Sequence, residues 1–403
     1  MAYIGSTLAG SRGGRRAQSL VSGVEYVLLG AFIGPHVLGV VTRSVTTSFE
    51  PLAIVALGWL AMADGFHCGH LGNARVSFLR VLQGWLFTCL IAGSVAALVG
   101  FTAYRLGWLQ GDVLWVSSIG MGLVSCESTR HTVRWVAERR LLKGSLARLI
   151  AEISSVDSAV SMPALAVLFL IAGRSPSKIS HIIPAWGTVA LVFVLGALLG
   201  LVVVVLFRMS LRQVEAWGVL LGTALLGSGL SVGTGAAWPA TLFATGIVLS
   251  AFVSRRHLLR LRFVRTERAV LLPTLLLAGT YLMVPGERWF FVLVLVAFAA
   301  HAIVTVAVSS IMRALSPVAR EGGPLLGVAM LSSGPLSISV GFACALQFQN
   351  IAGQLILATA VADTLLGELV GPWTLRRVLR KAGELAERGE SAELPVMQET
   401  GTP

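Results

Sequence analysis

Leu146 to Gly173 reads LARLIAEISSVDSAVSMPALAVLFLIAG, an apolar stretch with an aspartate near its middle. Its roughly 28 residues are enough for a helix that crosses a bilayer. A carboxylate at that depth costs several kcal/mol unless something compensates, so Asp157 predicts a functional site. Glu127 and His301 lie near the centres of two other apolar stretches. Three ionisable groups at membrane depth indicate a pathway for ions or protons.

The composition is typical of a polytopic membrane protein. Of the 403 residues, 55% are hydrophobic and only 12% are charged, and the mean hydropathy is +0.82. Soluble domains usually carry about 25% charged residues. The opening segment, Met1 to Gln18, is polar and basic, which is unlike a secretory signal. The four cysteines lack metal spacing and are interpreted as small apolar residues within the membrane: Cys68, Cys89, Cys126 and Cys344.

Continuous apolar runs without alternation predict helices rather than strands. Hydropathy predicts about twelve spans, of which only the second is short. Their approximate ranges are 19–41, 51–66, 79–104, 111–137, 146–173, 183–207, 213–231, 236–253, 268–286, 288–312, 323–346 and 352–375.

Basic residues recur in every second loop, which predicts the orientation in the membrane. They lie between spans 2–3, 4–5, 6–7, 8–9 and 10–11, and also near both ends of the chain. This places both termini in the cytoplasm, and it explains the net charge of +12 without a nucleic-acid partner. The residues in these loops are Arg75, Arg80, Arg139, Arg140, Lys143, Arg208, Arg212, Arg255, Arg256, Arg260, Arg262, Arg265, Arg313 and Arg320, and the end of the last span adds Arg376, Arg377, Arg380 and Lys381.

Two spans contain similar interruptions. Span 4 reads GMGLVSCES from Gly120, and span 11 reads GVAMLSSGP from Gly327. Each precedes, by about 30 residues, a central aspartate, Asp157 or Asp363. The odd-numbered spacing from span 4 to span 11 predicts inverted repeats with two broken helices that cross at the midplane of the membrane.

A broken helix exposes backbone carbonyl and amide groups that can replace the water shell of a cation. Glu127, Ser128 and Thr129 would add side-chain oxygens at this break, and Ser125 is a candidate for the pathway beside it. Hard cations favour oxygen ligands. Asp157 would supply the charge and would exchange a proton for a metal ion, which is the minimal device for antiport.

The sequence resembles the monovalent cation:proton antiporters, a family of sodium/proton and potassium/proton exchangers. Ser128 to Glu138 (STRHTVRWVAE, followed by RRLL) is similar to the fourth helix of the family and its following loop. YVLLGAFIGPHVLG from Tyr26 is similar to an early family pattern, and Gly58-Trp59 and Gly371-Pro372 also fit. Together these motifs cover nearly the whole chain. The resemblance implies a core of broken helices 4 and 11 beside helices 5 and 10, and a second bundle that forms a homodimer.

Departures from the family pattern leave several roles open. Helix 5 of the family carries an Asp-Asp, Asn-Asp or Gln-Asp pair, whereas this chain has Asp157-Ser158, and either residue can correspond to the essential second position. Many members have Thr at the position of Glu127, so this residue is a candidate for the displaced carboxylate. His301 falls where some members carry a Lys. A protonated His there would form a salt bridge with Asp157, and it would titrate nearer to neutral pH than a Lys. Ser333-Gly334-Pro335 replaces an Arg-Gly-Glu motif.

Further polar residues have competing interpretations. Glu152 would face the cytoplasmic access route, and Ser333 is a second pathway candidate. Asp363 and Glu368 lie outside the ion site that the family implies. We expect these two acids to form structural pairs with other side chains, for instance with Arg or His. For every site residue the alternative is a structural hydrogen bond within or between helices.

We therefore expect a secondary antiporter that exchanges protons for Na⁺ or K⁺ in a plasma membrane, the inner membrane of a bacterium. No cofactor is expected, and no nucleophile–base pair, metal cluster or phosphate loop indicates an enzyme. The alternatives are a relative that senses pH or serves as a scaffold, and a transporter of another small solute. The expected organisation is a basic amino terminus (1–18), a transporter domain (19–381) and a disordered tail (382–403). Within the transporter domain, the expected core is 79–173 with 288–375, and the expected scaffold is 19–66 with 213–286.

Overall fold

The computed structural model describes residues 23–71, 78–127, 144–154, 156–172, 185–209, 213–253, 256–283 and 285–384. Within these ranges all regular structure is helical, and seven helices are long and apolar enough to cross a membrane. Four shorter apolar helices accompany them. The chain is therefore a polytopic all-α membrane protein, as the sequence predicts.

The helices follow the predicted spans closely. In chain order they are α2 (Val24–Ile33), α3 (Arg43–Ser48), α4 (Glu50–Leu71), α5 (Phe78–Arg105), α6 (Gly111–Ser125), α8 (Ser145–Ser154), α9 (Asp157–Ala172), α10 (Ala185–Arg208), α11 (Gln213–Thr234), α12 (Trp238–Phe252), α13 (Arg256–Tyr281), α14 (Arg288–Leu315), α15 (Pro317–Glu321), α16 (Leu326–Ala329), α17 (Pro335–Gln347) and α18 (Ile351–Lys381).

Two expectations about the spans are wrong. The second span is not short, because α4 has 22 residues. The first ends early, since Gly34 precedes Pro35 and leaves the helical conformation, as residues before proline tend to do. The fifth predicted span corresponds to α8 and α9, which together give an apolar span of 28 residues, Ser145–Ala172.

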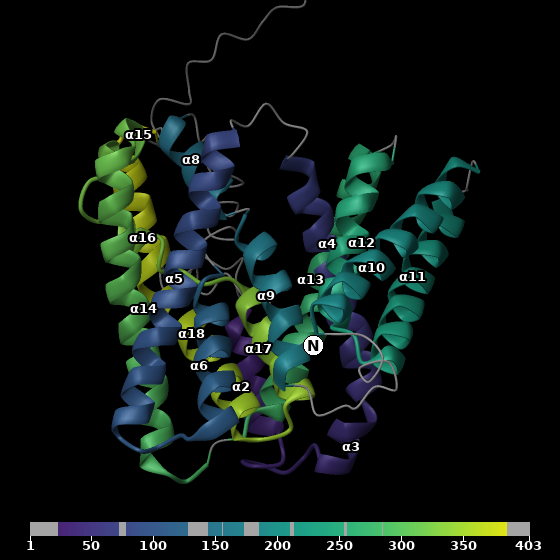
Figure 1. Cartoon of the computed structure of the whole chain (residues 1–403), viewed down its shortest axis with the longest axis horizontal. Coiled ribbons are helices and arrows are strands. Elements are labelled where there is room, and N and C mark those ends of the chain that lie inside the picture. The colour runs from purple at the N-terminus through teal and green to yellow at the C-terminus, as the bar shows by residue number, and fades with distance from the viewer. Residues whose placement is uncertain are drawn as a thin grey trace, which may run out of the picture.

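Two groups of helices lie side by side in Figure 1. On the right, α4, α10, α11 and α12 form one group, and on the left α5, α6, α14, α16 and α18 form the other. Small residues allow the backbones of α4 and α12 to touch. A Cβ on Gly65 would lie 2.0 Å from the Phe243 carbonyl oxygen, and one on Gly246 would lie 2.1 Å from that of Met62. The assignment of core and scaffold roles to these groups remains a prediction.

The predicted break in span 11 is confirmed. After α16, the chain leaves the helix at Met330 and re-enters it at Pro335, which occupies the first position of α17. Proline suits that position because its missing N–H has no partner in a first helical turn. The α17 end of this break meets α6, since the Ser337 hydroxyl donates a hydrogen bond of 2.7 Å to the carbonyl oxygen of Val124. The last turn of α6 and the start of α17 are thus joined.

The start of α8 is joined to the end of α18. The Glu384 carboxylate accepts hydrogen bonds from the backbone N–H groups of Leu146 (2.7 Å) and Ala147 (2.8 Å). Gly383, with a φ of 72°, turns the chain toward this contact. Glu384 is buried although the sequence places it in the tail. The rest of that tail, 385–403, lies outside the described residues.

Candidate ion site

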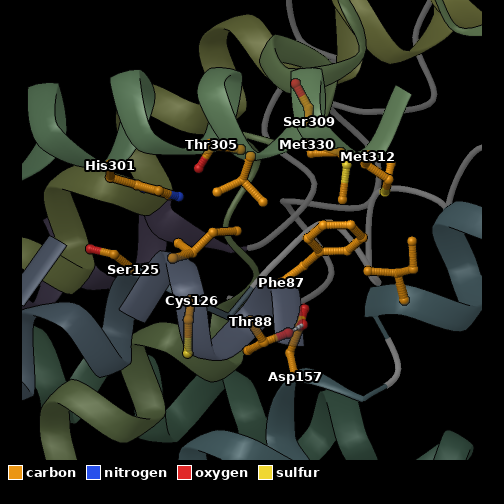
Figure 2. Close-up of a pocket in the computed structure, with 13 residues that line it drawn as sticks. Phe87, Thr88, Ser125, Cys126, Asp157, His301, Thr305, Ser309, Met312 and Met330 are labelled. Atoms are coloured by element: carbon orange, nitrogen blue, oxygen red, sulfur yellow. Dashed lines mark hydrogen bonds between the residues drawn. The ribbon is translucent and has the colours of Figure 1, made fainter. Parts of the chain in front are cut away.

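A small cavity lies where α5, α6, α8, α9 and α14 meet (Figure 2). Its volume is about 20 Å³, which is enough for one water molecule or one bare alkali cation. Its lining residues are Phe87, Thr88, Ile91, Ser125, Cys126, Ile153, Asp157, His301, Thr305, Val308, Ser309, Met312 and Met330.

Asp157 lies on one wall of this cavity, as the first residue of α9. Its side chain is 3% exposed, and its Oδ1 atom accepts a hydrogen bond of 2.7 Å from the Thr88 hydroxyl of α5. The same hydroxyl lies 2.9 Å from the carbonyl oxygen of Gly84, so it shares one proton between two acceptors. The start of a helix favours a negative charge. The structure therefore provides two groups that stabilise the carboxylate form.

Glycines bring the walls of the cavity together. A Cβ on Gly84 of α5 would lie 3.4 Å from the Cα atom of Ile153 in α8. A Cβ on Gly122 of α6 would lie 2.3 Å from the carbonyl oxygen of Ala92 in α5. A Cβ at Gly122 would push α6 away from α5, whereas one at Gly84 would reach α8 at ordinary van der Waals distance, so α5 packs closely on both neighbours.

His301 and Ser125 form the opposite wall, and both contact a second acid, Asp363 of α18 (Figure 2 shows the first two). The Nδ1 atom of His301 is 3.4 Å from Asp363 Oδ2, and the Ser125 hydroxyl donates a 2.6 Å hydrogen bond to the same oxygen. The expected pairing of His301 with Asp157 is therefore wrong. The rotation of α14 about its axis points the imidazole to α18 instead. The predicted structural pairing of Asp363 with a histidine is confirmed.

Glu127 lies two residues after the end of α6 and is not among the lining residues of the cavity. It is buried, and its carboxylate accepts a hydrogen bond from the Ser161 hydroxyl of α9. Ser161 is four residues after Asp157, on the same side of that helix. Glu127 is thus bound to the helix that carries Asp157, while Cys126 takes the position on the wall.

The remaining predicted residues lie away from the cavity or outside the described residues. Ser158 and Ser333 are buried but do not line it. Glu152 forms an ion pair of 3.3 Å with Arg80, and its neighbour Ile153 takes the place on the wall. Ser128 and Thr129 lie outside the described residues.

The lining favours a small cation over an anion. Hydroxyl or carboxylate oxygens come from Thr88, Ser125, Asp157, Thr305 and Ser309, whereas no lysine or arginine is among the described lining residues. Oxygen is the ligand that hard cations prefer. Among the described residues, no three His, Cys, Asp or Glu side chains are arranged to hold a metal ion.

Two residues that contribute to the site could not be predicted from the sequence. Thr88 is a single hydroxyl within an apolar span, with no motif around it. Ser337 lies in the second half of the broken span, and only the packing of α17 on α6 shows that its hydroxyl completes the end of α6. Contacts between distant spans depend on helix rotation, which hydropathy does not determine.

No family model matches this chain, and no curated protein matches its sequence. A search of solved structures finds the sodium proton antiporter MjNhaP1 from Methanocaldococcus jannaschii, solved at pH 8. The two share 14% sequence identity, with a TM-score of 0.62, over 94% of this chain and 96% of that chain. The chain therefore has the fold of a monovalent cation:proton antiporter.

Proposed function

We propose that this protein exchanges protons for a monovalent alkali cation, Na⁺ or K⁺, across a membrane. One observation carries the proposal. Asp157 lies in a buried cavity that holds one small occupant, opposite further oxygen atoms and without a described lysine or arginine on the wall. The similarity to a sodium/proton antiporter supports the same activity.

Competition at Asp157 is the proposed mechanism. A lone carboxylate at this depth costs about 2.5–3.5 kcal/mol on insertion scales, so the site is stable with either a proton or a cation on the acid. Cation entry favours loss of the carboxyl proton, and protonation removes the charge that holds the cation. The Thr88 hydroxyl, which donates to Oδ1, stabilises the charged form to which the cation binds. Because the occupants exclude each other, movement of the site across the membrane couples their opposite flows.

The position of the cavity supports access from the cytoplasm in this conformation. Its α14 residues run from His301 to Met312, toward the helix end that carries Arg313. That end lies near α8 and α15 at the top of Figure 1. By the positive-inside rule this is the cytoplasmic side, and both termini would lie there.

Contacts at the opposite end of the helices support a closed gate on the outer side of the membrane. The Gln354 side chain of α18 accepts a 2.8 Å hydrogen bond from the Met283 backbone N–H, just after α13. The rings of Tyr281 in α13 and Phe342 in α17 lie 5.2 Å apart. We propose that these contacts separate when the site opens outward.

The small volume of the cavity favours an inorganic cation over an organic anion. An organic anion would need a cavity larger than about one water molecule and a positively charged side chain as its partner. The serine at position 158, where the family carries a second acid, does not by itself favour a pH sensor, because Asp157 lies on the cavity wall while Ser158 does not.

We further propose a homodimer in a plasma membrane, with α11 at the contact. A shallow groove on this helix is lined by Gly222, Leu225, Leu226, Gly229, Leu230, Gly233 and Thr234. The three leucines are exposed, and small residues permit close helix approach. Gly229→Leu is expected to shift the protein toward monomers by native mass measurement, whereas Gly218→Leu, outside the groove on the same helix, is expected to leave dimers intact.

Proton flux in proteoliposomes tests the proposed exchange. Addition of Na⁺, K⁺ or Li⁺ is expected to collapse an imposed proton gradient, and Asp157→Asn is expected to abolish this response. Asp112→Asn, an exposed acid at the start of α6, serves as the matched control and is expected to remain active. Absence of flux with all three cations in a well-folded protein would contradict the proposal. Flux driven only by an organic solute would select the alternative transporter.

A further inference from the structure

A second, larger cavity lies at the other end of the helices, away from the ion site. Its volume is about 370 Å³, which is within the range of pockets that hold small organic ligands. One wall comes from α3 and the start of α4, and the others come from the ends of α13 and α17 and the start of α18. In Figure 1, α3 lies at the bottom of the molecule, whereas α8 and α15 lie at the top. By the positive-inside rule this cavity opens on the outer side of the membrane.

Two opposite charges line this cavity without forming an ion pair. Arg43 is the first residue of α3, and Glu50 is the first residue of α4. Neither side chain has an ion pair or a hydrogen bond within the part of the chain that the structure describes. Seven residues of helix separate the two positions, which corresponds to roughly 10 Å along the axis. A ligand that carries both a negative and a positive group can therefore contact both side chains at once.

The α18 wall of the cavity offers hydrogen-bond donors. The Asn350 side-chain oxygen accepts from the first backbone N–H groups of α18, at 3.0 and 3.3 Å, and the Gln354 side-chain oxygen accepts from the Met283 N–H. Backbone N–H groups are donors, so these bonds fix which end of each amide is oxygen and leave both NH₂ groups able to donate. Together with Arg43 and the imidazole of His36, they favour an anionic group that is rich in oxygen, such as a phosphate.

The segment that carries Arg43 and Glu50 is amphipathic. Its cavity side consists of residues at helical spacing, which share one face: Arg43, Thr46, Thr47 and Glu50. On a neighbouring face, Val45, Phe49 and Leu52 are exposed. This arrangement is typical of a segment at the surface of a bilayer, with its apolar side chains among the acyl chains and its polar side chains at the level of the headgroups. The cavity therefore lies where a lipid headgroup can enter it.

We propose that this cavity binds a phospholipid of the outer leaflet through an ethanolamine phosphate headgroup. The phosphate contacts the Arg43 guanidinium and the amide NH₂ groups, and the primary ammonium donates to the Glu50 carboxylate. The acyl chains pass along Val45 and Phe49. A choline headgroup has no N–H to donate, and a glycerol headgroup has no positive charge, so both leave Glu50 without a partner.

Lipid binding to the full-length protein tests this proposal. Delipidated protein in detergent is titrated with phosphatidylethanolamine, phosphatidylcholine or phosphatidylglycerol of matched short acyl chains, and bound lipid is counted by native mass measurement. We expect the ethanolamine lipid to bind about 10-fold more tightly than the other two, or better. Free ethanolamine phosphate is expected to bind much more weakly, because it lacks the acyl chains that contact the apolar face.

Two variants separate the contributions of the charges. Arg43→Gln is expected to weaken the binding of all three lipids by about 10-fold, because each of them carries a phosphate. Glu50→Gln is expected to weaken only the ethanolamine lipid, so that the preference disappears. Arg105→Gln and Asp112→Asn are the matched controls, since both residues are exposed on the same outer side and neither lines the cavity. Both controls are expected to keep the affinity and the preference.

Several outcomes overturn the proposal. Equal binding of the three lipids by the unchanged protein contradicts it, as does a preference for the ethanolamine lipid that survives Glu50→Gln. Binding of free ethanolamine phosphate as tightly as the lipid would show that the ligand is a soluble zwitterion and not a lipid. Should a charge variant fail to fold, Thr47→Phe, which fills the cavity and keeps both charges, takes its place. Unchanged lipid binding by that variant would then contradict the proposal.

Discussion

Asp157 and Asp363 hold comparable positions in the chain, yet their surroundings differ. Each follows an interrupted span by about 30 residues, and each is buried beside the same small cavity. Asp157 starts a helix, receives the Thr88 hydroxyl and opens onto the cavity. Asp363 does not line the cavity but contacts Ser125 and His301, which do. Similar sequence positions thus acquire different surroundings: an opening onto the cavity for Asp157, and a buried contact with a hydroxyl and an imidazole for Asp363.

The largest effect is expected from moving the first acid by one residue. The double change Asp157→Ser with Ser158→Asp keeps the composition but rotates the carboxylate by about 100° around α9. The new acid would leave the cavity wall, because Ser158 does not line it. We expect cation-driven proton flux to fall by about 100-fold or more, equivalent to a few kcal/mol. Retained flux would show that Asp157 does not act through this cavity.

A smaller effect is expected from removing the hydroxyl on the Asp157 wall. Thr88→Val keeps the shape but removes the hydrogen bond to the carboxylate. Hydrogen bonds to charged groups contribute about 1.5–3 kcal/mol, so the cation concentration for half-maximal flux should rise about 10-fold or more. Thr88→Ser, which keeps the hydroxyl, should remain near the original value. An equal half-maximal cation concentration for the two variants would show that the Thr88 hydroxyl does not contribute to cation binding.

On the opposite wall, removing a hydroxyl should lower cation affinity less than removing the hydroxyl of Thr88. Ser125→Ala deletes one neutral oxygen of the cavity wall and leaves the pair of His301 and Asp363 in place. A neutral oxygen contributes about 0.5–1.5 kcal/mol, so the cation concentration for half-maximal flux should rise only a few-fold. An unchanged concentration would indicate that Ser125 does not contact the cation.

The smallest effect on transport is expected where the two regions are joined. Glu384 connects the end of α18, which carries Asp363, to the start of α8, which precedes Asp157. Glu384→Ala removes a charged helix cap, a change worth about 1–2 kcal/mol. The melting temperature should therefore fall by a few degrees while the cation dependence stays the same. Glu321→Ala, at the end of α15, provides an acid control for the same assay, and an equal melting temperature for both variants would contradict the role of the cap.

Sequence patterns predict the helices, the break in span 11 and the buried position of Asp157. Apolar runs determine where a chain crosses the membrane, and small, polar or helix-breaking residues such as Ser333-Gly334-Pro335 mark where a helix is interrupted. The patterns do not give the rotation of each helix. For that reason the partner of His301 was predicted as Asp157, although the imidazole contacts Asp363. Thr88 was missed for the same reason, because its role depends on how closely α5 packs on α9.

Cation affinity measured against pH tests the central claim most directly. If a proton and a cation compete for Asp157, the dissociation constant should rise as the pH falls, by up to about 10-fold per pH unit where the cation-free acid is protonated. Asp157→Asn should remove specific binding at every pH. Affinity that does not depend on pH, or that survives Asp157→Asn, would contradict exchange at this acid.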